Sequence, residues 1–192
     1  RFPVGDGEPD FSHREEPEQE EIDANRAVYI AFHALTTDAN LSAEEQYQYR
    51  RTIFENLQNL DWTTYGAQGE AGRDVETCGE LTAYLASMGD LTESEILNLQ
   101  LGVRSKPDGF YTENYSAVLA NAFFLYPIQF TQCLANNDLS LQEAKDVVSF
   151  TAYGADYFTE LKEAAVGQVE RYGLTGQEGA KNGVRMVNSQ IW

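Results

Sequence analysis

The sequence predicts an all-α protein of about six helices, arranged as three helical hairpins around a central apolar helix, with extended N- and C-terminal tails. Apolar residues recur at the three- and four-residue spacing of helices through most of residues 24–171. A phrase typical of helix starts, Asp/Asn-Leu-Ser/Thr-x-x-Glu, begins at positions 40, 90 and 138. Each phrase lies between two apolar segments, and a short polar joint between helices is typical of a helical hairpin.

The chain divides by composition into three regions. Residues 1–23 hold nine acidic residues and three of the five prolines and have little apolar periodicity, which predicts an extended acidic arm. Residues 24–171 form the predicted helical domain. Residues 172–192 begin with a glycine-rich stretch and are predicted to be a C-terminal extension.

The first half of the domain is expected to hold four helices. The first, near residues 24–37, is apolar on nearly all sides, so we expect it to be buried, with His33 as a packing residue. The second begins with a capping box of Ser42 and Glu45 and carries an apolar face to Leu60. A loop is expected at residues 61–75. The third and fourth helices have apolar faces formed by Cys78, Leu81, Leu85 and Met88, and by Ile96, Leu99 and Val103.

The second half is expected to hold the central helix and one long final helix. Residues 104–113 are predicted to be a loop, and residues 114–137 carry no charge. We therefore expect a core helix there, kinked or broken at Pro127 because proline lacks the amide that the helix ladder needs. The last helix is predicted to run without a break to about Arg171.

The three phrases are 50 and 48 residues apart, which is compatible with two origins. A period near 50 lies in the range of helical repeats. Capping boxes also recur independently, because every helix start has unpaired N–H groups. Sequence similarity outside the phrases is poor, so shared helix-start chemistry is favoured over triplication.

The charge balance narrows the classes of partner. With 31 acidic and 13 basic residues, the chain carries a net charge of −18. Such a surface is repelled by nucleic-acid phosphates, so no nucleic-acid role is expected, and it favours cations or basic proteins. Polar residues interrupt the charge-free stretch, so no transmembrane segment is predicted. The chain starts at Arg1 rather than Met, from which we predict a processed protein that is secreted or resident in an organelle lumen.

No motif of catalysis or of tight metal binding stands out. The two histidines, His13 and His33, lie in no zinc or di-iron spacing, and no nucleophile elbow or phosphate loop is present. We therefore expect no enzyme activity and no cofactor. Weak binding of a divalent cation at residues 136–138 or 15–21 is an alternative, although solvated turns and tails fit those acidic and amide groups better.

Two sets of residues offer further hypotheses. Cys78 and Cys133 allow one disulfide, with two buried thiols as the alternative. The aromatic cluster of the charge-free stretch lines either a pocket for an apolar ligand or, more simply, the core. Its members are Phe123, Phe124, Tyr126 and Phe130.

The function predicted from the sequence is a non-enzymatic interaction or structural protein, a subunit or accessory factor of a larger assembly that docks through its terminal arms. Apolar residues of the arms are the candidate anchors: Phe2, Val4, Phe11, Ile191 and Trp192. A carrier of a small apolar ligand or pigment is the first alternative.

Overall fold

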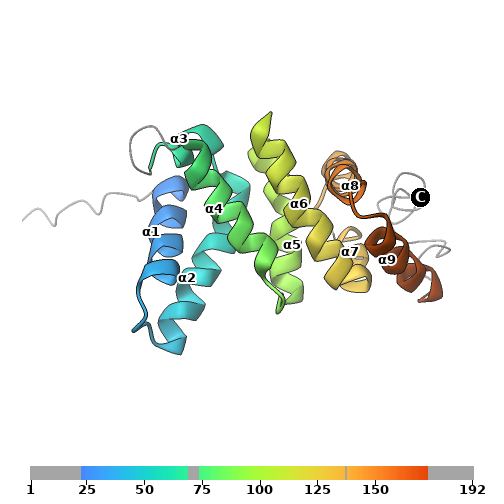
Figure 1. The fold of residues 1–192 in the computed structure, drawn as a ribbon, viewed down its shortest axis with the longest axis horizontal. Helices are drawn as coiled ribbons and strands as arrows, with labels where there is room; N and C mark the ends of the chain where they lie inside the picture. The colour runs from blue at the N-terminus through green and yellow to red at the C-terminus, as the bar shows by residue number, and fades with distance from the viewer. Residues whose placement is uncertain (1–22, 69–73, 137, 173–192) are drawn as a thin grey trace, which may run out of the picture.

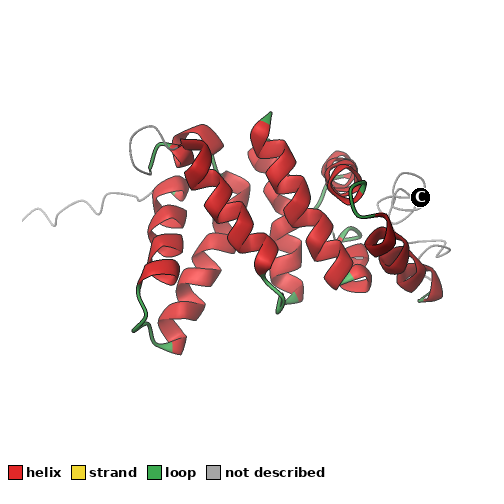
Figure 2. Cartoon of the chain, viewed as in Figure 1, coloured by secondary structure: helices red, strands yellow, loops and turns green. Residues whose placement is uncertain are grey.

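The structure, a computed structural model, describes residues 23–68, 74–136 and 138–172, and these residues form helices and turns without a strand (Figures 1 and 2). The helices are α1 (Ala24–Thr37), α2 (Ala43–Asn56), η1 (Leu57–Asn59), α3 (Trp62–Gly66), α4 (Asp74–Ser87), α5 (Glu93–Leu101), η2 (Gly102–Ser105), α6 (Phe110–Leu125), α7 (Pro127–Cys133), α8 (Leu141–Ala155) and α9 (Thr159–Arg171). The all-α prediction is confirmed. None of the described helices combines the length and the apolarity needed to cross a membrane.

The helices follow one another along the long axis, from α1 and α2 at one end to α9 at the other (Figure 1). α1 packs against α2, and α6 packs most extensively against α8 and then α4. The exact three-hairpin arrangement is not confirmed, because α4 has its main contacts with α6 and α3, and α5 has its main contacts with α7. The apolar α6 is central, as predicted.

The three helix-start phrases all form complete capping boxes. In each, the hydroxyl of Ser42, Thr92 or Ser140 accepts from a backbone N–H three residues on, and the glutamate at that position accepts from the backbone N–H of the cap residue. These boxes start α2, α5 and α8, so each satisfies backbone donors that a helix start otherwise leaves unpaired. The sequence prediction of three helix starts is correct.

Proline and glycine account for the breaks and close crossings in the second half. α6 ends at Leu125 and α7 begins at Pro127, so the predicted break is confirmed. Gly154 lies where α8 crosses α6: a Cβ there would lie 2.2 Å from the carbonyl oxygen of Ser116. Because no larger residue fits that space, Gly154 permits the close approach of α8 to α6.

Several details of the predicted helices are wrong. Residues 138–171 do not form one long helix: α8 ends at Ala155, and Phe158, whose backbone is not helical, precedes α9. The expected loop at 61–75 contains the short α3, whose start is capped by Asp61. His33 is exposed rather than packed, because α1 buries the single face formed by Asn25, Val28, Ala31 and Phe32.

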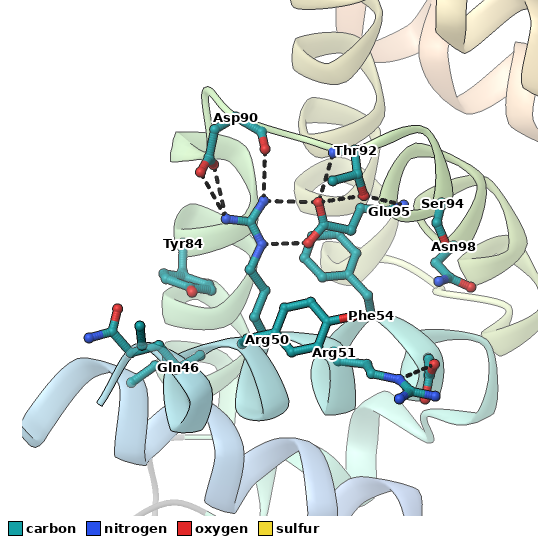
Figure 3. A pocket seen from close by; sticks show the side chains of 14 residues that line it. Gln46, Arg50, Arg51, Phe54, Tyr84, Asp90, Thr92, Ser94, Glu95 and Asn98 are labelled. Atoms are coloured by element: carbon teal, nitrogen blue, oxygen red, sulfur yellow. Dashed lines mark hydrogen bonds and ion pairs between the residues drawn. The ribbon is translucent and has the colours of Figure 1, made fainter. Parts of the chain in front are cut away.

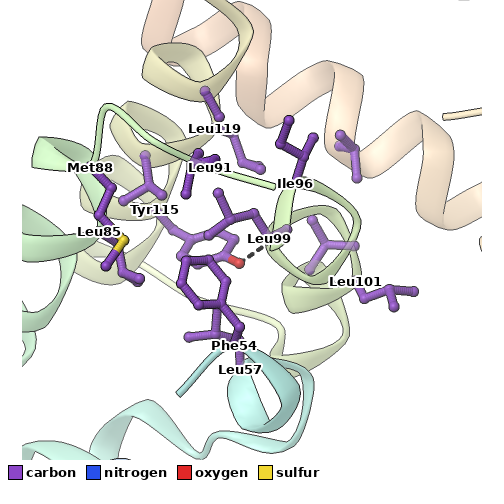
Figure 4. Close-up of a cluster of buried hydrophobic side chains, with 14 of the residues drawn as sticks. Phe54, Leu57, Leu85, Met88, Leu91, Ile96, Leu99, Leu101, Tyr115 and Leu119 are labelled. Carbon is purple, nitrogen blue, oxygen red and sulfur yellow. Dashed lines mark hydrogen bonds between the residues drawn. The ribbon is translucent and has the colours of Figure 1, made fainter. Parts of the chain in front are cut away.

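The core runs through the array, and Figure 4 shows its middle section, where α2, η1, α4, α5 and α6 meet. The Tyr115 side chain is fully buried, and its hydroxyl donates to the carbonyl oxygen of Leu99 at 2.7 Å. Burial raises the pKa of Tyr115, so the hydroxyl stays a donor. Gly102 sits directly against this ring, and a Cβ there would overlap the tyrosine oxygen at 1.8 Å. In this part of the core, the Tyr115 hydrogen bond joins α6 to α5, and Gly102 leaves the space that the Tyr115 ring occupies.

Candidate functional site: a groove between α2 and α5

A groove of about 530 Å³ opens between α2 and α5, beside the end of α4 (Figure 3). Its apolar surface comes from Leu35, Phe54 and Tyr84. Its polar surface comes from α2 and from the start of α5 with the turn before it: Gln46, Tyr47, Arg50, Arg51, Glu55, Asp90, Thr92, Ser94, Glu95 and Asn98. The groove is thus amphipathic and lies between two helices that are separate in sequence.

Arg50 joins the two walls of the groove. Its Nε and Nη2 atoms donate to the two carboxylate oxygens of Glu95 at 2.5 and 2.9 Å. Its Nη1 donates to both carboxylate oxygens of Asp90 at 3.0 and 3.1 Å, and Nη2 also donates to the Asp90 carbonyl oxygen. The guanidinium lies 5.9 Å from the centre of the Phe54 ring. We call these four residues the Arg50 cluster.

The Arg50 cluster sets one cation against two carboxylates. The hydrogen bonds with Glu95 and Asp90 outweigh partial burial and raise the pKa of Arg50. Partial burial disfavours the ionised form of Glu95, but the hydrogen bonds from Arg50 and from the backbone and hydroxyl of Thr92 leave its pKa below the ordinary value. Both partners stay ionised near neutral pH, so the cluster fixes the spacing of α2 and α5.

Beyond the cluster, the groove presents groups that are suited to contact another chain. Ser94 and Asn98 lie one turn apart on α5 and line the same side of the groove (Figure 3). Tyr47 lines the α2 side, and 59% of its surface is exposed. Amide, hydroxyl and tyrosine groups are those that adaptable protein-binding surfaces use.

A second cavity, of about 470 Å³, lies where α3, η2 and the start of α6 meet. The Trp62 ring stacks on Tyr111 at a centroid distance of 6.0 Å, and its indole N–H donates to Ser105 Oγ at 2.8 Å. Lys106 adopts a left-handed backbone conformation with φ of 49°, and it also lines this cavity. The indole is therefore held by a structural hydrogen bond.

The predicted aromatic cluster divides between the core and the surface of α6 and α7. Phe123 and Phe130 are fully buried and meet edge to face at 5.6 Å. Phe124 contacts Phe158, and Tyr126 donates to the Gly89 carbonyl at 2.5 Å and accepts from the Leu91 N–H. Both cavities described above are lined by other residues, so an apolar-ligand pocket at this cluster stays a prediction.

The predicted disulfide is not formed. Both thiols are buried, on α4 and α7 as expected, but they contact different elements. The Cys78 thiol donates to the Trp62 carbonyl at 3.3 Å, whereas Cys133 lies 3.7 Å from the Glu93 carbonyl. Burial raises the pKa of Cys133 to about 11, so it is an unreactive thiol at neutral pH.

The metal and anchor predictions lie mostly outside the described residues. Phe2, Val4, Phe11, His13, residues 15–21, Asn137, Ile191 and Trp192 all belong to segments whose placement is not described. Asn136 is described, and its side-chain oxygen accepts from the Asp138 N–H in a local turn. Among the described residues, no group of three His, Cys, Asp or Glu side chains is arranged to hold a metal ion.

Sequence reasoning identified Glu95 as a cap residue but missed its partner, since Arg50 lies 45 positions away. A local phrase contains no sign of such a contact. No family model, curated protein or solved structure matches this chain.

Proposed function

We propose that this protein is a non-enzymatic helical scaffold, part of a larger assembly, that binds a cationic segment of a partner protein in the α2–α5 groove. The observation that carries the proposal is the groove itself, an amphipathic groove of about 530 Å³ whose two walls are joined by the Arg50 cluster. Binding to a preformed groove costs less ordering of the receptor than binding to a surface that must first rearrange.

Charge is the reason to expect a cationic segment. Among the groove residues, Arg50 and Arg51 are opposed by Glu55, Asp90 and Glu95, and both arginines are already paired with these carboxylates. The chain as a whole carries −18, so its long-range field attracts basic partners and repels acidic ones.

Ser94, Asn98 and Tyr47 would supply the contacts. The amide of Asn98 has both donors and an acceptor, which matches the alternating N–H and C=O groups of a peptide backbone. Tyr47 adds a large apolar face with a polar tip at low conformational cost. This set of groups in the groove therefore fits a peptide better than it fits a metal ion or a reacting substrate.

The experiment is selection of a displayed library of random peptides against the full chain, followed by titration of the enriched peptides. We expect enrichment of lysine- and arginine-containing peptides, with affinity that falls as salt is raised. The double variant Tyr47→Ala/Asn98→Ala should weaken binding at least about tenfold, which corresponds to about 1.4 kcal/mol.

The matched control is Tyr157→Ala, which removes a tyrosine from the α8–α9 junction, remote from the groove residues; this tyrosine is 77% exposed, against 59% for Tyr47. It should leave peptide affinity unchanged. Equal binding to the groove variant and to the wild type, or no saturable binding by any enriched peptide, would overturn the proposal.

A further inference from the structure

Five large apolar side chains are exposed in the second half of the array, at the end of α6, on α8, between α8 and α9, and on α9. Leu125, Tyr153, Tyr157, Phe158 and Leu161 have exposed fractions of 49, 43, 77, 52 and 52%. We call this set the junction patch. Large exposed apolar patches of this kind mark interaction surfaces.

One ring contact joins two members of the junction patch, and a second joins the patch to α6. Tyr153 and Tyr157 meet edge to face at 6.3 Å, and the adjacent Phe158 meets Phe124 of α6 at 6.2 Å. Leu125 directly follows Phe124, and Leu161 lies one turn after Phe158 on α9. The patch therefore extends across three helices.

The patch has an acidic rim. Glu113, Asp156, Glu160 and Glu163 are exposed around it, and Glu113 accepts a hydrogen bond from the Tyr153 hydroxyl at 3.5 Å. Lys162 is the cation in this stretch, and it is already paired with Asp156 at 2.9 Å. An occupant of this surface should therefore be both apolar and cationic.

Residues 181–192 of the chain itself have that chemistry. The segment reads Lys-Asn-Gly-Val-Arg-Met-Val-Asn-Ser-Gln-Ile-Trp, with two cations, five large apolar residues and no acid. No acidic side chain in this segment offsets its two cations. Charge and hydrophobicity both match the junction patch.

The segment can reach the patch from the end of α9. α9 has 13 residues, so its two ends are about 20 Å apart. Residues 173–180 number eight and span up to roughly 27 Å when extended. Lys181 can therefore lie beside the first turn of α9, where Phe158 and Leu161 are exposed.

We propose that residues 181–192 dock on the junction patch of the same chain, with Trp192 and Ile191 against its aromatic side chains and with Lys181 and Arg185 facing its acidic rim. This docking is independent of the α2–α5 groove. It covers a surface that otherwise exposes five large apolar side chains.

Tryptophan fluorescence tests the docking directly, since the chain has two tryptophans and Trp62 is only 4% exposed. Subtracting the spectrum of Trp192→Phe from that of the wild type isolates the emission of Trp192. We expect emission at a shorter wavelength than that of a free peptide of residues 181–192, because the docked ring is removed from water. The patch variant Tyr157→Ser/Leu161→Ser should shift it to the wavelength of the free peptide.

Two further measurements test whether residues 181–192 of the same chain, rather than of a second copy, cover the junction patch. The groove variant Tyr47→Ala/Asn98→Ala is the matched control and should leave the Trp192 emission unchanged. The emission should also be independent of protein concentration. Emission equal to that of the free peptide in the wild type, no response to the patch variant, or a shift on dilution would overturn the proposal, the last by showing that a second copy supplies the segment.

Discussion

The cap of α2 and the caps of α5 and α8 have the same local design but differ in their tertiary partners. Glu95 receives Arg50 from α2, and Glu143 receives the Nε of Arg104 at 2.6 Å. Arg104 also donates to the Asp138 carbonyl and to Gln58. Within the described residues, Glu45 binds only the backbone and hydroxyl of Ser42.

The apolar part of the phrase shows the same difference. Leu91 and Leu139, which precede the caps of α5 and α8, are buried, as are Ile96 and Ala144 at the fourth positions of those helices. This is the arrangement of a hydrophobic staple. At α2 the corresponding residue, Gln46, instead donates from its side chain to the Leu41 carbonyl.

The same capping phrase therefore has two structural roles in this chain. At α2 it satisfies the helix start alone, and at α5 and α8 it also joins the helix to an earlier part of the array. The two arginines come from different elements, the middle of α2 and the 3₁₀ turn η2. Non-equivalent arginines favour recurrence of cap chemistry over duplication of one complete unit.

Removing Arg50 should give the largest effect. Arg50→Ala leaves Glu95, whose side chain is only 14% exposed, without its cation, so we expect a loss of about 2–3 kcal/mol in unfolding free energy. Urea denaturation at pH 7 measures it through the transition midpoint. Arg51→Ala is the matched control, since the Arg51–Glu55 ion pair is exposed to solvent. It should give no resolvable change in the urea midpoint. Equal midpoints for the two variants would show that the Arg50 cluster does not join the walls.

Removing Arg104 should have a smaller effect. Its side chain is 35% exposed and that of Glu143 is 24% exposed, so solvent screens the pair more than it screens Arg50 and Glu95. We expect Arg104→Ala to cost about 1 kcal/mol in the same urea measurement. A double-mutant cycle with Glu143→Ala should return most of that cost as coupling. Additive effects of the two substitutions would mean that the pair contributes nothing.

Acid should remove the contribution of Glu143 selectively. The hydrogen bond from Arg104, opposed by slight desolvation and aided by Ser140, lowers the pKa of Glu143 from 4.5 to about 2. A depressed folded pKa gives stability that is present above pH 4.5 and is lost as pH falls toward 2. The difference in unfolding free energy between wild type and Glu143→Gln should therefore shrink over this window. A difference that is constant from pH 7 to pH 2 would contradict the shift.

The difference between the caps also shows which structural features can be predicted from local sequence. The helix starts at Ser42, Thr92 and Ser140 and the break at Pro127 were predicted correctly, because each depends on residues within one turn. The Arg50 cluster joins residues 40 and 45 positions apart, and nothing in either segment indicates the other.

The wrong predictions have the same origin. The exposure of His33 and the end of α8 at Ala155 depend on which helices pack together. The disulfide prediction failed for this reason too, since Cys78 and Cys133 pack against α3 and α5 rather than against each other. The groove contains one residue of each kind. Glu95 could be recognised from the sequence as a cap residue, whereas its partner Arg50 is brought to it only by the fold. The predicted secretion or lumenal location stays a prediction.

The smallest effect should come from the cap that stands alone. Glu45→Gln keeps the shape of the side chain and a hydrogen-bond acceptor for the Ser42 N–H but removes the negative charge from the first turn of α2. The pKa of Glu45 is lowered mainly by its side-chain and backbone hydrogen bonds with Ser42, so its ionised form has a local role only. We expect a decrease in thermal midpoint at pH 7 that is smaller than that of Glu95→Gln or Glu143→Gln. If Glu45→Gln destabilised the chain as much as Glu95→Gln does, the arginine partner would add nothing to the cap. The α5 and α8 caps would then contribute no more to stability than the α2 cap, which contacts only its own helix start.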